Sequence, residues 1–408
     1  MTEPLTEIPD GFIMSLTLGT PPQVIQKIFF DTGSDLFWVP CGKMSFTCIG
    51  CPHYKRDLST ILNPMSSSSS IRESCMSPLC VNLHSAENYY DTCIAAGCSL
   101  DSIHNKTCMR LCPAFAYTYA YGVVAGHLVI EILDTHQAKN LGNPNITFGC
   151  VSSTVIEPTG IVGFGRGPLS LPSQLGFLSK GFSHCFLSFD FSSNPNISCP
   201  LVLGDIATSS KEHFQFTQML YNPVYPYFYY IGLKGVTVGD TTIQAPVSLS
   251  EFNSSGDGGF LMDSGTTYTH LPEPFYSQLL STLKSVIKYP RAEDVEDGSW
   301  SDLCYDMPIR KNNSQPDGLP SVTFHFLNNV SLTLAQGTYF YKMARPKGST
   351  QVQCLMFQQM DDERGPGGVF GSFQQQNVEV VYDLEKERIG FQTTDCASLA
   401  KTHGLHRT

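Results

Sequence analysis

One short pattern occurs twice in this chain of 408 residues, once in each half. An apolar run ends in Asp-Thr-Gly-Ser at Asp31 to Ser34, and a second apolar run ends in Asp-Ser-Gly-Thr at Asp263 to Thr266. Each copy is followed later by two apolar residues between glycines, at Gly160 to Gly163 and at Gly368 to Gly371. A single copy would carry little weight, because Asp and Gly are ordinary turn residues. Repetition in the same order predicts two halves built on one plan.

Short strand-like segments separated by glycine, proline and asparagine run through both halves. Their alternation and their β-branched and aromatic residues favour strands, which we expect at 12–18, 24–30, 116–121, 127–133, 227–238, 322–327 and 378–382. One helical pattern covers 274–287, and the stretches 291–302 and 361–368 are expected to be surface loops. The chain is therefore predicted to be mostly β, with an N-terminal lobe over 1–205 and a C-terminal lobe over 206–408.

The composition excludes several function classes. Hydrophobic residues make up 41% of the chain and charged residues 15%, so a large core can form. The net charge of −11 disfavours nucleic acids and anionic membrane surfaces as partners. No apolar run reaches the roughly 18 to 20 residues that a membrane span needs. We therefore expect neither nucleic acid nor membrane among the partners.

Cysteines and glycosylation signals together indicate an oxidising compartment. The chain has 15 cysteines, nine of them between Cys41 and Cys112, and a cytosolic protein rarely needs so many. Candidate glycosylation sites are the asparagines of six Asn-x-Ser/Thr sequons: Asn105, Asn145, Asn196, Asn253, Asn312 and Asn329. The start of the chain lacks the pattern of a signal peptide. We expect a secreted or vacuolar protein whose targeting segment has been removed from this mature portion.

The alternative for the cysteines is a zinc site. Cys48-x-x-Cys51 is one possible half-site, but no second pair follows at zinc spacing. We therefore predict structural disulfides and no metal. The odd number of cysteines leaves at least one thiol without a partner in the chain, and Cys199 is a candidate for it.

The two Asp-Thr/Ser-Gly turns suit the hydrolysis of an amide by water. An aspartate at the end of a buried strand lies in a low dielectric, and two such groups placed face to face would share one proton. One carboxylate can then activate a water while the other protonates the substrate. Asp31 and Asp263 are the predicted catalytic pair, and no cofactor is needed. The predicted supporting residues are Thr32 and Ser264, which can bond across the lobe interface, Ser34 and Thr266, which can bond the outer carboxylate oxygens, and the turn glycines Gly33 and Gly265.

Five segments, in this order, resemble the pepsin-type aspartic proteases and, within them, the plant nepenthesin-like branch. They are Leu-Gly-Thr-Pro-Pro-Gln at 18–23, Asp-Thr-Gly-Ser-Asp-Leu-Phe-Trp at 31–38, Gly-Arg-Gly-Pro-Leu-Ser-Leu-Pro-Ser-Gln-Leu at 165–175, Asp-Ser-Gly-Thr-Thr at 263–267, and Phe-Gln-Gln-Gln-Asn at 373–377. The resemblance covers nearly the whole chain. It implies a bilobal pepsin-like fold with lobes related by a pseudo-two-fold axis, a Cys-rich insertion in the first lobe, and a peptide-binding cleft.

The resemblance also implies roles for individual residues. Substrate-binding residues would be Trp38, which steadies the flap, the flap residues Tyr121 and Gly122, the pocket residues Ile161 and Phe164, and Thr267 of the second motif. Cys304 with Cys354 matches the second-lobe disulfide of the family, and a Cys185 with Cys396 link is suggested. The Asp-Gly-Ser that follows the flap glycine in the family is absent after Gly122, so the flap tip is predicted to be shortened.

These observations predict a monomeric aspartic endopeptidase that cleaves peptides or proteins at acidic pH and favours apolar residues around the scissile bond. The alternative is a catalytically weak or silent binding protein of the same fold, resembling the plant inhibitors of cell-wall glycosidases. Both turn aspartates and their hydroxyl neighbours favour the enzyme, whereas the altered flap favours the alternative.

Overall fold

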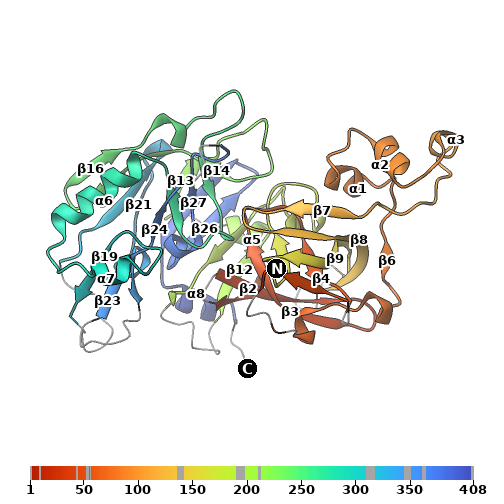
Figure 1. Ribbon diagram of the computed structural model, residues 1–408, viewed down its shortest axis with the longest axis horizontal. Coiled ribbons are helices and arrows are strands. Elements are labelled where there is room, and N and C mark those ends of the chain that lie inside the picture. The colour runs from red at the N-terminus through yellow and green to blue at the C-terminus, as the bar shows by residue number, and fades with distance from the viewer. Residues whose placement is uncertain are drawn as a thin grey trace. The chain divides into compact units, whose positions relative to one another are not determined.

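The structure is a computed structural model that describes residues 2–8, 11–42, 45–51, 55, 57–135, 142–189, 198–209, 213–308, 318–343, 351–360 and 364–405 (Figure 1). The chain divides into two compact units. Unit 1 comprises residues 1–2 and 13–178, and unit 2 comprises residues 3–12 and 179–408. Most ordered segments of both units are strands, which confirms the mostly β prediction.

Unit 1 is built on one large sheet. Its strands are hydrogen-bonded in the order β2 (Gly11–Leu18), β3 (Gln23–Asp31), β10 (Ile161–Gly163), β4 (Trp38–Pro40), β9 (Asn145–Val155), β8 (Val123–Asp134) and β6 (Ile71–Arg72). β5 (Thr47–Ile49) pairs with β9, and β7 (Phe115–Thr118) pairs with β8. Other ordered segments of unit 1 include α4 (Leu171–Gln174) and the single 3₁₀ turns Leu58–Thr60 and Pro64–Ser66. A core that includes Leu36, Trp38 and Ile161 is buried against this sheet.

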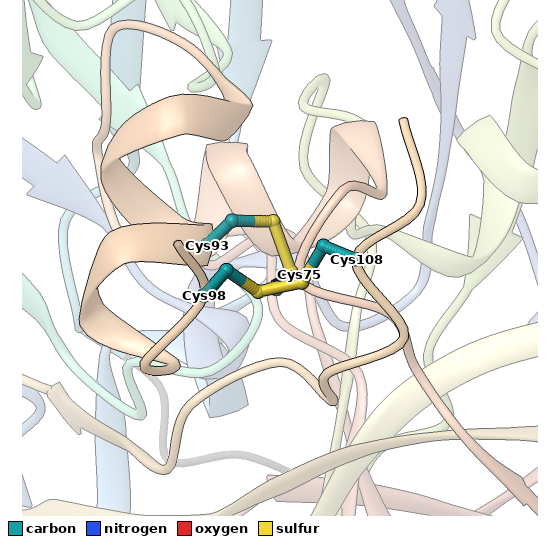
Figure 2. Close-up of side chains that lie close together, drawn as sticks. All are labelled: Cys75, Cys93, Cys98 and Cys108. Carbon is teal, nitrogen blue, oxygen red and sulfur yellow. Dashed lines mark hydrogen bonds between the residues drawn. A yellow bond between two sulfur atoms is a disulfide. The ribbon is translucent and has the colours of Figure 1, made fainter. Parts of the chain in front are cut away.

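The Cys-rich segment of unit 1 forms three short helices, α1 (Pro78–Leu83), α2 (Tyr89–Ala95) and α3 (Leu100–His104). Each begins at a polar N-cap side chain that accepts a backbone N–H, as Ser77 does from Leu79. Disulfides Cys75–Cys93 and Cys98–Cys108 lie together here, with the Cys75 and Cys108 Sγ atoms 3.7 Å apart (Figure 2). Because the helices are too short to be stable alone, these cross-links replace much of an apolar core.

In its described residues, unit 2 contains one part of the large 15-stranded sheet and three smaller sheets. The first has the order β13 (Gln215–Gln218), β27 (Arg388–Thr393), β26 (Val378–Asp383), β11 (Phe182–Cys185), β12 (Cys199–Leu203) and β1 (Thr2–Ile8). The second is β14 (Tyr230–Ile231), β17 (Phe260–Met262), β25 (Gly368–Phe370), β18 (Thr269–Leu271) and β24 (Phe357–Gln359). The third is β16 (Thr241–Gln244), β15 (Leu233–Val238), β20 (Val322–Phe326) and β21 (Ser331–Thr333). The fourth is β19 (Cys304–Met307), β23 (Gln351–Leu355) and β22 (Phe340–Met343).

The predicted helix over 274–287 is confirmed as α6 (Phe275–Val286), which buries Phe275, Leu279 and Leu283 on one face. Other helices of unit 2 are α5 (Asp205–Thr208), α7 (Glu293–Glu296) and α8 (Cys396–Thr402), with single 3₁₀ turns at Val247–Leu249, Leu327–Asn329, Gln336–Thr338 and Ser372–Gln375. α7 lies inside the stretch 291–302 that we expected to be loop. Arg291 donates to the Glu296 carboxylate there and closes the turn. Residues 361–363 of the second expected loop lie outside the described residues.

Three boundaries predicted from the sequence differ from the structure. The division between the units follows Leu178 rather than residue 205, because β11 and β12 pair with each other and β11 with β26, in the sheet of unit 2. The strand expected over 227–238 is interrupted at Gly232, between β14 and β15. The strand expected over 116–121 ends at Thr118, where the chain turns toward β8.

An aromatic run over 225–230, which its composition would place in a strand packed on both faces, is mostly a turn, and its last two residues, Tyr229 and Tyr230, are buried. Only Tyr230 lies in a strand, while Tyr225 and Tyr227 are exposed. The Asn222 side chain accepts the N–H groups of Val224 and Tyr225, at 3.0 and 3.1 Å, and folds the segment into a turn. Prolines at 223 and 226 have no N–H to give to a sheet, so turn chemistry overrides aromatic strand propensity.

The disulfides agree with the pairings that the family resemblance implied. Cys304–Cys354 and Cys185–Cys396 are both present, and so are Cys41–Cys150, Cys48–Cys51 and Cys80–Cys112. Cys199 is the free cysteine, and it is buried. Among the described residues, no helix has the length and apolar character needed to cross a membrane.

Candidate active site

The first aspartate stands at the end of strand β3 of unit 1, where Phe30 and Asp31 are buried. Asp31 closes β3 and is 7% exposed. Its Oδ1 accepts the N–H of Gly33 at 2.8 Å, and its Oδ2 accepts the hydroxyl of Ser34. The turn is thus folded around the carboxylate, with one oxygen held by backbone and the other by a hydroxyl. The hydroxyl of Ser34 makes the hydrogen bond to the carboxylate that the sequence predicted, while its part in catalysis stays a prediction.

The second aspartate is held in the same way in unit 2. Asp263 follows β17, and its Oδ1 accepts the N–H groups of Gly265 and Thr266 at 2.8 and 3.1 Å. Its Oδ2 accepts the hydroxyl of Thr266 at 2.6 Å, as predicted. Thr32 and Ser264, the second residues of the two turns, are both almost fully buried. Their predicted bonding across the lobe interface stays a prediction.

The apolar segment that follows each motif later in the chain pairs with the strand that leads into the carboxylate turn. In unit 1, β10 runs parallel to β3 and pairs Gly163 with Asp31, and the N–H of Phe164 donates to the Asp31 carbonyl at 2.7 Å. In unit 2, β25 runs parallel to β17 and pairs Phe370 with Met262. Both halves therefore build a carboxylate turn on a parallel strand pair, which is the internal repeat predicted from the sequence.

Side chains expected to bind substrate near Asp31 are largely buried. Trp38 is fully buried in β4 and pairs with Ile161 of β10, which is 6% exposed. Phe164 is fully buried, and its ring packs on that of Phe30 with centroids 4.6 Å apart. In unit 2, the Thr267 carbonyl accepts the N–H of Phe373 at 2.9 Å. Roles of these residues toward a substrate stay predictions.

The predicted flap is a hairpin of β7 and β8 with a short turn. The N–H of Tyr119 donates to the Gly122 carbonyl at 2.7 Å, so four residues make the connection. Tyr121 stands at this turn with 70% of its surface exposed. Tyr119, which sequence reasoning did not select, packs instead against the core that holds Trp38, and burial raises the pKa of its hydroxyl well above the usual value. The sequence offered a signal for it, since Tyr117, Tyr119 and Tyr121 stand at every second position of the chain.

A third carboxyl near the site was also missed. Asp35 lies four residues after Asp31 in the sequence, and its exposed fraction is 6%. Burial raises its pKa to about 7, against the opposing effect of the N–H groups of Leu169 and Gly167. The signal for it in the sequence was a single charge followed by the apolar run Leu-Phe-Trp. Asp35 therefore carries a proton under the mildly acidic conditions in which an ordinary aspartate is ionised.

The described sequons are accessible. Asn105, Asn145, Asn253 and Asn329 are all exposed, while Asn196 and Asn312 lie outside the described residues. The Asn253 amide donates to Asp257 at 3.0 Å, and its oxygen accepts the N–H groups of Ser255 and Asp257 at 2.9 Å each. A glycan on Asn253 would have to form on an amide that already closes a turn.

Comparisons with known proteins agree with this geometry. Two family models match, Xylanase inhibitor N-terminal over residues 12–205 and Xylanase inhibitor C-terminal over residues 228–393. A probable aspartyl protease of Arabidopsis thaliana is 35% identical in an alignment that covers 95% of this chain and 83% of that protein. Aspartic proteinase nepenthesin-1 of Nepenthes gracilis is 33% identical, with 95% of this chain and 79% of that protein covered.

A solved structure is also similar. The crystal structure of conglutin gamma, a basic 7S globulin from lupine seeds, matches with a TM-score of 0.66 and 18% identity over 98% of each chain. At that identity the likeness supports the fold, which is mostly β and pepsin-like. Together with the two carboxylate turns and the identity to plant proteases, these matches show that the chain belongs to the pepsin-type aspartic proteases, in their plant, nepenthesin-like branch.

Proposed function

We propose that this protein is an aspartic endopeptidase that hydrolyses peptide bonds of peptide or protein substrates at acidic pH. The observation that carries the proposal is the equivalence of the two turns. Asp31 lies at the end of β3 and Asp263 directly follows β17, and each has one carboxylate oxygen held by backbone N–H and the other by a hydroxyl. Two carboxylates so prepared, one from each half, are the groups that acid-base hydrolysis of an amide requires.

In the proposed reaction Asp31 and Asp263 act on one water molecule and share one proton. The ionised member takes a proton from the water, whose oxygen attacks the carbonyl carbon, while the protonated member donates to the carbonyl oxygen. Collapse of the tetrahedral intermediate then breaks the C–N bond, and the nitrogen leaves with a proton from the pair. Hydroxyls of Ser34 and Thr266 fix the carboxylate planes, so the pair is oriented before substrate binds. The pair titrates as a unit, so acid and base are not assigned to individual residues.

The short hairpin makes flap length a test of turnover. Insertion of Asp-Gly-Ser after Gly122 restores the residues that the family carries there, and it should raise kcat/KM on a peptide substrate about tenfold. The reason is that flap donors orient the peptide and flap closure excludes water. Steady-state cleavage of a fluorogenic peptide at pH 4 measures the change.

The same three residues inserted after Gly239, in the β15–β16 turn of unit 2, serve as the control and should leave kcat/KM within twofold. Equal kcat/KM for the chain with the longer flap and the unaltered chain would show that flap length does not limit activity.

A second candidate function is that of a catalytically silent inhibitor of a cell-wall glycosidase. Two observations favour it, namely the short β7–β8 turn and the xylanase-inhibitor family models that match both halves. The deciding experiment incubates the purified chain with a plant cell-wall xylanase and with the fluorogenic peptide. Peptide cleavage without xylanase inhibition supports the peptidase, and the reverse supports the inhibitor.

We further propose that the protein is a secreted or vacuolar glycoprotein. Seven disulfides support this, because they persist in oxidising compartments. Four exposed sequons support it as well. Peptide mass mapping of the plant-expressed protein, before and after enzymatic removal of N-glycans, should show occupancy at Asn105, Asn145 or Asn329.

A further inference from the structure

We propose that Asp35 is a positioning residue for Asp31, and that the buried side-chain carboxyl of Asp35 anchors the Asp31 turn to the segment Gly163 to Leu169. This inference rests on the proposed peptidase function for its kinetic part. Its structural part concerns unit 1 alone and can be tested without any activity.

The contacts of the Asp35 carboxyl define the anchor. Its Oδ2 accepts the N–H of Leu169 at 3.2 Å, across 134 positions of sequence. An added Cβ at Gly167 would lie 2.2 to 2.6 Å from all three carboxyl atoms, so the carboxyl packs directly on that glycine. Its Oδ1 is buried and has no hydrogen-bond partner among the residues that the structure describes. The carboxyl therefore fills a space that only a glycine leaves open.

The backbone on both sides of this contact holds the Asp31 turn. The N–H of Phe164 donates to the Asp31 carbonyl at 2.7 Å, and the N–H of Gly165 donates to the Ser34 carbonyl at 2.9 Å. An added Cβ at Gly163 would lie 2.4 Å from the Asp35 backbone, so the two segments are in close contact. Asp35 adds a side-chain link to this backbone contact, four residues after the catalytic aspartate.

The surroundings of Asp35 favour a neutral carboxyl. Tyr117 of β7 is a titratable group that interacts electrostatically with both Asp35 and Asp31, and Arg166 is the charged residue of the anchoring segment, with a half-buried side chain. Burial raises the pKa of Asp35 to about 7. The unmatched Oδ1 is better tolerated on a protonated carboxyl than on a carboxylate, because an unpaired buried charge costs more than an unpaired neutral group.

The first experiment compares Asp35→Asn and Asp35→Ala with the unaltered chain. Asparagine has nearly the same shape as a protonated aspartate and cannot ionise. In Asp35→Asn, kcat at pH 4 and pepstatin affinity should therefore stay within about threefold of the unaltered chain. Alanine removes the anchor and should lower kcat about 10- to 100-fold with KM within about threefold. Rescue by asparagine separates a positioning role from a requirement for a carboxylate in the chemistry.

The same variants give a pH readout that needs no turnover. Asp35 is protonated when folded and ionised when unfolded between about pH 4 and pH 7, so it lowers stability progressively as pH rises through that range. Asp35→Asn lacks this dependence. Its melting temperature should match that of the unaltered chain at pH 4 and exceed it by at least about 5 °C at pH 7.5. A difference that stays constant across this range would overturn the proposal.

A double-mutant cycle tests the contact itself. Gly167→Ala should lower both melting temperature and kcat in the unaltered chain, because the methyl group collides with the Asp35 carboxyl. In the Asp35→Ala background the same change should have at most a third of that effect. Gly298→Ala is the matched control, since an added Cβ there meets no atom closer than 3.9 Å. Equal effects of Gly167→Ala in both backgrounds would contradict the proposal.

The two readouts separate the two proposals. If the unaltered chain cleaves no peptide and binds no pepstatin, the peptidase function fails, while the melting-temperature profile and the cycle still decide the anchor. If the chain is active but Asp35→Ala keeps full kcat, the positioning role fails and the peptidase function stands.

Discussion

Replacing either Asp31 or Asp263 with asparagine should abolish peptide cleavage. We expect kcat/KM to fall at least about 10³-fold in each variant, since general acid-base catalysis contributes on the order of 10² to 10⁴ and the pair works as one unit. Asparagine is close in shape and can keep the turn hydrogen bonds, so both variants should fold and melt near the temperature of the unaltered chain. The measurement is cleavage of a mixed peptide library between pH 3 and 7, with and without pepstatin.

Asp205→Asn is the matched control. Asp205 lies in α5 and pairs with Lys180 on the surface, with 75% of its side chain exposed. Its loss should change kcat/KM by no more than twofold. If either catalytic variant retained more than a tenth of the activity, Asp31 and Asp263 would not form the catalytic pair. The cut sites of the unaltered chain would then have to come from a different catalytic site.

A second large effect, on the pH dependence of the free energy of unfolding, is expected from replacing His184, which is far from the two aspartates in sequence. This histidine lies in β11, is 1% exposed and stacks on Phe186 with ring centroids 4.1 Å apart. Burial lowers its pKa to about 3. Between about pH 6.5 and pH 3 the unfolded chain therefore binds a proton that the folded chain does not, and stability falls as the pH falls through that range. The loss at pH 3.5 is on the order of 4 kcal/mol.

His184→Phe should remove this acid sensitivity while keeping the aromatic stack. Relative to the unaltered chain, the variant should gain nothing at pH 7.5 and about 4 kcal/mol in the free energy of unfolding at pH 3.5. Denaturant titrations at pH 3.5, 5.0 and 7.5 measure the difference. His104→Gln, a change at an exposed position of α3, should show none. A variant that loses stability in parallel with the unaltered chain as the pH falls would contradict the assignment.

Asp35 and His184 act with opposite signs over nearly the same pH range. Raising the pH ionises Asp35 in the unfolded chain and lowers stability, whereas lowering the pH protonates His184 in the unfolded chain and lowers stability. Their contributions offset one another in the unaltered chain. Each becomes visible as the difference between a single variant and the unaltered chain, and one lies in each unit.

The sequence by itself determined the plan of the molecule. The repeated Asp-Thr/Ser-Gly pattern, each copy after an apolar run, predicted the strand-ending turns at Asp31 and Asp263 and their hydroxyl partners Ser34 and Thr266. The turns were predictable because the carboxylate accepts hydrogen bonds from the N–H groups of residues just after it. Four consecutive residues therefore contain all the groups that form the turn. The helix α6 was predictable for the same reason, since its apolar spacing and its end signals are local.

Tertiary structure alone decided features that depend on residues distant in the sequence. Nothing near Asp35 shows that Gly167 leaves room for its carboxyl, and only that packing makes it a neutral acid. From the sequence alone, His184 is a polar residue in a short strand. In the structure β11 pairs with a strand on each side, and His184 is buried. The same holds for the division after Leu178, which is set by the strands that β11 and β12 join. Burial and pKa depend on which segments meet, and a linear pattern carries that information only where the interacting residues are neighbours in the chain.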